Sequence, residues 1–152
     1  IFDGEGVTEK IKTTGNTNGI AFTKALQTRD FEGLAFVNLV DFDMLYGHRR
    51  DVAGYAAAAT EFDKFVADFI PGMREGDILM VTADHGCDPS YTKTTDHTRE
   101  YVPYLIYGKG IKPGVDLGTH LCFGTIAQTI CEYLGVDASS LDGKSVWNEI
   151  KA

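Results

Sequence analysis

The sequence contains few cysteines and no long apolar run. Its three cysteines, Cys87, Cys122 and Cys131, show no CxxC spacing. This sparse, odd set argues against a secreted disulfide framework and against a thiolate zinc finger, so we expect reduced thiols and a cytoplasmic protein. No apolar run approaches the roughly 20 residues of a membrane-spanning helix. The first residues also lack the basic and apolar regions of a signal peptide, so no membrane partner is expected.

Basic side chains are also scarce. There are 14 Lys and Arg residues against 22 Asp and Glu, which gives a formal net charge of −8. Binding to duplex nucleic acid depends on clustered Lys and Arg that neutralise phosphates, so nucleic acid is not an expected partner. The charge is compatible with a small phosphate ester held by metal ions. No Walker-type phosphate loop is present, which excludes the P-loop mechanism of NTP binding.

The remaining composition is that of a folded domain. The chain has 152 residues, of which 43% are hydrophobic and 24% charged. These values predict one globular domain or a large piece of a bigger one. The sequence starts with Ile-Phe-Asp instead of Met. We therefore expect it to be a fragment of a longer protein.

Three short apolar runs rich in β-branched residues predict strands. They cover residues 34–40, 78–83 and 101–107. The first two are expected to be buried, as in a parallel sheet. Pro103 makes the third run less suited to a central position, because proline cannot donate to a strand ladder.

Helical periodicity is clearest over residues 51–70, where apolar residues recur every three or four positions. Asp51 is the expected N-cap of this helix, and a Pro-Gly pair ends it. Shorter helices are expected at three other places: from a cap at Asn16, Thr17 or Asn18 to Gln27, over residues 125–134, and over residues 145–151. Strand, helix and strand in alternation predict an α/β fold, a mostly parallel sheet with helices on both faces.

Acidic and imidazole side chains follow the predicted strands, where ligands of open parallel sheets gather. The first strand runs into a segment from Asp41 to His48 that contains Asp43. The second strand runs into Asp84-His85, and a third cluster, Asp96-His97, lies in the polar loop just before the third strand. Any one pair could be a solvated ion pair, Asp41 could brace its own loop, and a single histidine is more often structural.

Taken together, these clusters predict a metal centre. Several carboxylates in one crevice cost free energy unless a cation or a hydrogen-bond network compensates them. Mixed carboxylate and imidazole ligands suit Zn²⁺, Mn²⁺ or Fe²⁺ better than Ca²⁺. Two such ions a few ångströms apart suit in-line displacement at phosphorus.

Three motifs in a fixed order give a specific resemblance. They are VDFDMLYGHRRD at residues 40–51, TADHGCDP at residues 82–89 and TDHTREYVP at residues 95–103. With these motifs the chain resembles the phosphopentomutases, which belong to the alkaline phosphatase superfamily of metalloenzymes. The resemblance runs through the whole chain and implies an alkaline-phosphatase-like core.

The resemblance implies roles for five residues. Asp43, His48 and His97 match the ligands of one metal ion, usually Mn²⁺, and Asp84 and His85 match two ligands of a second. Family members complete the second site with an Asp and a nucleophilic Thr, carried as phosphothreonine, from an N-terminal segment that is not found in this sequence. Their cap domain is also not found. Residues 1–152 would therefore be the C-terminal half of the catalytic core, without a catalytic residue of its own and inactive in isolation.

The implied activity is that of an isomerase. It would move a phosphoryl group between C1 and C5 of ribose or deoxyribose through a sugar bisphosphate intermediate. Two alternatives stay open: a related metal-dependent phosphatase or cofactor-independent phosphoglycerate mutase, and a non-catalytic metal-binding fragment. Near the ligands, Arg49, Arg50 and Arg99 could clamp a phosphate or be solvated or paired with Asp. His120 lacks a motif, and we expect it to be structural or exposed.

Overall fold

A computed structural model describes residues 4–152, which divide into two compact units. The first unit contains the chain up to Gly72 together with Asp84–Val102. The second contains Met73–Ala83 and Pro103–Ala152. Each unit is therefore built from two separate segments of the sequence, which alternate between the units along the chain. Each unit is described in turn.

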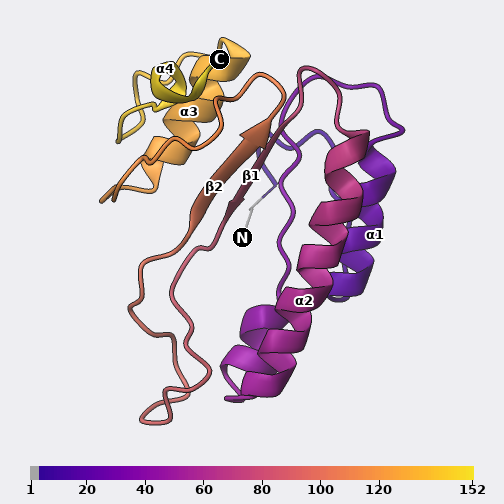
Figure 1. The fold of residues 1–152 in the computed structure, drawn as a ribbon, viewed down its shortest axis with the longest axis vertical. Coiled ribbons are helices and arrows are strands. Elements are labelled where there is room, and N and C mark those ends of the chain that lie inside the picture. Colours follow the sequence, from indigo (N-terminus) through magenta and orange to yellow (C-terminus); the bar gives the residue numbers. More distant parts are fainter. Residues whose placement is uncertain (1–3) are drawn as a thin grey trace. The chain divides into compact units, whose positions relative to one another are not determined.

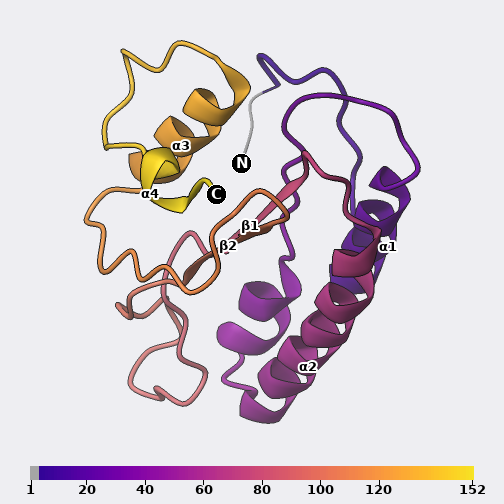
Figure 2. The same ribbon diagram turned by 45° about the horizontal axis from the view of Figure 1, so that its top comes forward.

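Two helices that lie side by side are the longest elements of the first unit (Figures 1 and 2). They are α1, Asn16–Leu26, and α2, Val52–Phe69, and the unit also has a π-helical turn, η1, at Phe42–Gly47 and a 3-10 turn, η2, at Ile70–Gly72. Polar contacts join the two long helices. Lys24 Nζ lies 3.1 Å from Asp68 Oδ2, and Gln27 Nε2 donates to the carbonyl oxygen of Phe69 at 2.7 Å.

The bounds of α2 confirm the predicted helix. The Asp51 side chain accepts a hydrogen bond from Gly54 N at 2.9 Å, as expected of an N-cap that satisfies a free amide of the first turn. The buried residues of α2 are Ala58 and Phe65, while Val52 and Ala59 of the apolar period are exposed. Phe65 is 6% exposed, and its ring centroid lies 5.8 Å from that of Phe62 and 5.2 Å from that of Phe69.

The predicted cap of α1 is wrong. None of the local side chains caps this helix, and Gly15 occupies the N-cap position. Instead, Asp41 Oδ2 accepts a hydrogen bond from Asn16 N at 2.7 Å. A carboxylate is well placed at the positive end of a helix, where free amides point outward. Asp41 thus stabilises the start of α1 as well as its own loop.

The second unit contains a two-stranded sheet and two helices (Figure 1). The strands are β1, Ile78–Thr82, and β2, Tyr104–Gly108, and the helices are α3, Gly124–Leu134, and α4, Trp147–Ile150. Gly135 ends α3 with a φ of 68°, a conformation that glycine adopts without strain. Val146 and Ile150 are almost fully buried, and the buried Thr129 Oγ1 accepts a hydrogen bond from Val146 N at 3.1 Å.

The expectation of a mostly parallel sheet is wrong for the residues that the structure describes. Strands β1 and β2 pair antiparallel, with Met80 opposite Ile106. Parallel neighbours need a long crossover, usually a helix, and the segment between these strands contains none. Strand β2 begins directly after Pro103. Proline has no amide hydrogen to donate, but it lies just outside the strand, so no hydrogen bond of the sheet is lost.

The strand predicted over residues 34–40 does not form. This run has no regular secondary structure, and Leu34 and Phe36 are 62% and 58% exposed. A β-strand is stable only when its backbone groups pair with a neighbour. Within residues 4–152, β1 and β2 pair with each other, and neither pairs with this run.

Two further observations concern expectations about cysteine and membranes. All three cysteines are free thiols. No helix within residues 4–152 has both the length and the apolar character needed to cross a bilayer.

Candidate metal centre

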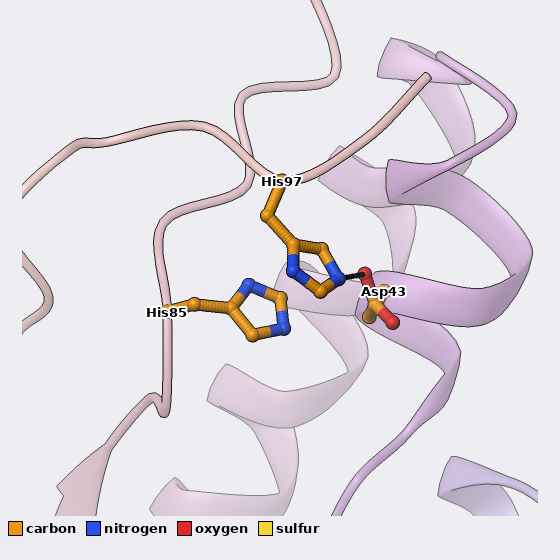
Figure 3. A group of neighbouring side chains, drawn as sticks. All are labelled: Asp43, His85 and His97. Carbon is orange, nitrogen blue, oxygen red and sulfur yellow. Dashed lines mark ion pairs between the residues drawn. The ribbon is translucent and has the colours of Figure 1, made fainter. Parts of the chain in front are cut away.

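Three side chains from distant parts of the sequence converge in the first unit. Asp43 comes from η1, and His85 and His97 come from the two arms of the segment that follows β1. One possible ligand atom from each residue lies within 4.8 Å of the other two. Figure 3 shows the His97 ring between the His85 ring and the Asp43 carboxylate.

The π-helical turn η1 positions Asp43. His48 N donates to the carbonyl oxygen of Asp43 at 3.0 Å, a five-residue step that widens the helix. Such single π-turns are rare and are frequent at functional sites. Gly47 in this turn is buried, and a Cβ there would collide with Cys87 Sγ and lie 2.9 Å from the carbonyl oxygen of Phe42. Glycine is therefore required by the close approach of the 84–102 segment.

Asp43 is the centre of the cluster. Its Oδ1 atom lies 3.3 Å from His48 Nε2, 3.5 Å from His97 Nε2 and 3.9 Å from Cys87 Sγ. The Asp43, His48 and His97 side chains are between 31% and 42% exposed. The group is thus held by the fold and still open to a small molecule from solvent.

The orientation of His48 leaves a nitrogen lone pair directed at a carboxylate. Its Nδ1 atom lies 2.5 Å from the carbonyl oxygen of Thr95. A carbonyl can only accept, so the proton of the neutral ring sits on Nδ1 and Nε2 carries the lone pair. That lone pair faces Asp43 Oδ1, which repels it unless a proton or a metal cation lies between them. A backbone carbonyl on the second nitrogen is typical of metal-binding histidines.

A backbone bridge brings His85 and His97 together. Gly86 and Thr98 form an isolated antiparallel bridge, in which Thr98 N donates to the carbonyl oxygen of Gly86 at 3.0 Å. Each histidine directly precedes one of the bridged residues. Their rings stack with centroids 3.6 Å apart and an interplanar angle of 17°. A Cβ at Gly86 would lie 2.7 Å from Glu100 N, so glycine permits this close pairing.

Asp84 lies at the edge of the cluster. It falls in a bend just after β1, so the strand has opened there, and the side chains of Asp84 and His85 need not point to opposite faces as they would in a regular strand. Its side chain is 78% exposed, and Oδ1 lies 3.7 Å from His85 Nε2. The structure therefore brings all five predicted ligand residues into one region, in which Asp43 lies nearest to His48 and His97 and Asp84 is the most exposed.

The structure also places the three arginines, His120 and Cys87, for which the sequence indicated no definite role. Arg50 donates to backbone carbonyls of the 88–96 segment, a role that the sequence pattern did not reveal. Arg49, Arg99 and His120 are exposed. Cys87 is half-buried beside Asp43, and burial, with a smaller contribution from that carboxylate, raises the pKa of its thiol. A neutral thiol is a poor nucleophile, in agreement with a packing role.

The donor set fits a divalent transition metal. A cation with bonds of about 2.1 Å holds its ligand atoms within roughly 4.2 Å of one another, close to the spread seen here. One carboxylate oxygen with imidazole nitrogens is a ligand set used for zinc, manganese and iron.

The comparisons with known proteins agree with this chemistry. The chain is 51% identical over 150 residues to the phosphopentomutase of Acetivibrio thermocellus and 53% identical over 149 residues to that of Lachnoclostridium phytofermentans. It is 54% identical over 136 residues to the phosphopentomutase of an Anaeromyxobacter species. These matches cover 99%, 98% and 90% of this chain but only 38%, 38% and 34% of the relatives. The resemblance drawn from the three motifs is confirmed.

A family model gives the classification. The model of the metalloenzyme superfamily matches residues 2–138, which is most of the chain and includes every residue of the cluster. One conclusion follows from three observations: the acidic and histidine motifs, the converged carboxylate–imidazole cluster and this family match. The chain belongs to the metalloenzyme superfamily.

Proposed function

We propose that this chain is part of a phosphopentomutase, an isomerase that interconverts the 1-phosphate and 5-phosphate of ribose or deoxyribose. The observation that carries the proposal is the identity of 51% to 54% with three proteins of that name, over 90% or more of this chain. The carboxylate–imidazole cluster supplies the chemistry that such a reaction needs.

The metal ligands belong to this proposal. Asp43, His48 and His97 would hold one Mn²⁺, and the distances from Asp43 Oδ1 to both imidazoles support that assignment. Asp84 and His85 would contribute to a second Mn²⁺, and the distance of 3.7 Å between Asp84 Oδ1 and His85 Nε2 supports that assignment. When bound, the two ions would neutralise the charge of the phosphoryl group during its transfer. Other divalent metals with the same ligand preference would also fit.

The residues of the chain would orient the site. The carbonyl oxygen of Thr95 holds the His48 ring so that Nε2 faces Asp43. The bridge between Gly86 and Thr98 fixes the spacing of the other two imidazoles. Side chains preset by backbone contacts need little rearrangement when charge develops on a substrate, which lowers the barrier.

The chain spans 38% of the length of two of these relatives, so the activity is proposed for the full-length protein. Residues 1–152 would be the C-terminal half of an alkaline-phosphatase-like core. The phosphothreonine nucleophile, the remaining metal ligand and the cap domain would lie elsewhere in the longer protein. This stretch by itself would be inactive, and the free cysteines support a cytoplasmic location.

The direct test is turnover by the full-length protein. With Mn²⁺, we expect conversion of ribose 1-phosphate to ribose 5-phosphate, and we expect Asp43→Asn to lower the rate at least about 100-fold. Absence of conversion by a folded, metal-loaded protein would refute the proposal. Release of inorganic phosphate, or interconversion of phosphoglycerates, would instead identify the related phosphatase or glycerate enzyme.

A further inference from the structure

The side chain of Arg50 is directed at the backbone of one segment. Its Nε and Nη2 atoms donate to the carbonyl oxygen of Thr94 at 2.8 and 2.6 Å. Nη2 also donates to the carbonyl oxygen of Asp96 at 2.5 Å, and Nη1 donates to that of Asp88 at 3.0 Å. One guanidinium thus holds three carbonyls of the 88–96 segment, directly before His97.

The backbone of Arg50 is unusual as well. Its φ is 54°, and it is the one residue other than glycine with a positive φ among residues 4–152. Side chains with a Cβ adopt this region at a cost, and such outliers persist where surrounding contacts enforce them. Here the enforcing contacts are the four guanidinium hydrogen bonds and the bond from Arg50 N to the carbonyl oxygen of Gly47 at 3.0 Å.

Both imidazoles beside Asp43 depend on this segment. His97 follows Asp96, whose carbonyl accepts from Arg50. His48 is oriented by the carbonyl oxygen of Thr95, which lies between the two residues that Arg50 holds most closely. Without the guanidinium, the Gly86–Thr98 bridge would still close the base of this loop, and residues 94–96 would lose three hydrogen bonds to Arg50 and keep the one between His48 Nδ1 and the carbonyl oxygen of Thr95.

We infer that Arg50 is a positioning residue: it fixes the 88–96 segment against η1 so that His48 and His97 both meet Asp43. The inference rests on the proposed metal site and adds to it a residue that touches neither metal nor substrate. It also removes Arg50 from the candidates for a phosphate clamp, because all three of its guanidinium nitrogens donate to protein carbonyls.

The sign of the change in Mn²⁺ affinity after removal of the Arg50 guanidinium distinguishes a positioning role from a purely electrostatic one. A guanidinium near the cluster repels a divalent cation, so removal of its charge alone would tighten Mn²⁺ binding. Loss of positioning would weaken Mn²⁺ binding, because two ligands would no longer be held in place. The two effects have opposite signs.

The experiment compares Mn²⁺ affinity by titration calorimetry in the full-length protein and three variants. Arg50→Gly removes the guanidinium and accepts the positive φ, and Arg50→Lys keeps the charge but loses the planar fork. Arg49→Ala is the matched control, because it removes one exposed positive charge from the neighbouring residue. We expect at least about tenfold weaker binding in both Arg50 variants and less than about twofold change in the control. Unchanged or tighter binding in Arg50→Gly would overturn the inference.

A second measurement does not depend on metal. Amide hydrogen exchange of the metal-free proteins reports local opening of the 88–98 segment. We expect exchange at least about tenfold faster there in Arg50→Gly, with α2 unchanged and Arg49→Ala like wild type. Equal exchange in Arg50→Gly and wild type would refute the positioning role. If wild type bound no Mn²⁺, the proposed metal function would fail, and exchange would still decide the role of Arg50.

Discussion

Asp41 and Asn16 form a reciprocal pair of hydrogen bonds across 25 residues of sequence. Asp41 Oδ2 accepts from Asn16 N at 2.7 Å, and Asn16 Oδ1 accepts from Asp41 N at 3.0 Å. Asn16 is 5% exposed. The pair therefore joins the start of α1 to the residue that precedes η1, and it supports the turn that carries Asp43.

Removal of the Asp41 carboxylate is expected to destabilise the protein. Asp41→Ala would leave the first amide of α1 without its acceptor, at a cost of about 1–2 kcal/mol, while the bond from the backbone amide of residue 41 to Asn16 Oδ1 is kept. Urea unfolding measures the difference. Asp63→Ala, which removes an exposed carboxylate from α2, is the control and should change stability by less than about 0.5 kcal/mol. A loss of stability in Asp41→Ala no larger than that of the control would contradict this capping role.

A methyl group at Gly47 is expected to disturb the metal centre. Gly47→Ala would push against Cys87 Sγ and the carbonyl oxygen of Phe42, with an overpacking cost of about 1–3 kcal/mol. Thermal unfolding should show the loss, and Cys87→Ala should restore part of it. The control is Gly110→Ala, because a Cβ at Gly110 meets no atom within 4 Å. Equal stability of the two glycine variants would show that the 84–102 segment does not press on η1.

Manganese is expected to stabilise the full-length protein through the histidine cluster. At 100 times its dissociation constant, a ligand of the native state adds about 2.7 kcal/mol. The melting temperature should therefore rise with Mn²⁺ and fall after chelation. His97→Ala should abolish most of the rise, whereas His120→Ala, an exposed histidine outside the cluster, should leave it intact. The same rise in both variants would remove His97 from the site.

The carboxylate of Asp77 is expected to stabilise the second unit in a pH-dependent manner. Burial pushes the pKa of Asp77 up, but hydrogen bonds from Arg74 outweigh it and leave the pKa below its usual value of 3.8. A carboxyl group with a lowered pKa stabilises the folded protein at pH values above the pKa that the group has in the unfolded state. This contribution is lost as the pH falls through the pKa that the group has in the folded state.

Asp77→Asn should therefore cost about 1 kcal/mol near neutral pH, and the difference from wild type should shrink below pH 3.8. Urea titrations across that range measure it, with Asp63→Asn, which removes an exposed carboxylate of α2, as the charge control. A difference that stayed constant down to the lowest pH would mean that the ionised carboxylate is not the stabilising form.

The sequence by itself determined the features that depend on neighbouring residues. The apolar period and Asp51 cap of α2, the apolar run of β1 and the glycine end of α3 lie within a few positions of the groups they act on. The ligand motifs, although far apart, could be recognised because each is a short pattern of acidic and imidazole side chains.

Tertiary structure decided everything that needs a distant partner. Residues 34–40 have the composition of a strand, but a strand also needs a paired neighbour, which no local pattern supplies. The carboxylate that caps α1 comes from Asp41, and the guanidinium that holds the segment before His97 comes from Arg50, 38 to 46 residues from the carbonyls it binds. Hydrogen bonds over such separations form only after the backbone has folded, so their geometry is a property of the whole packing.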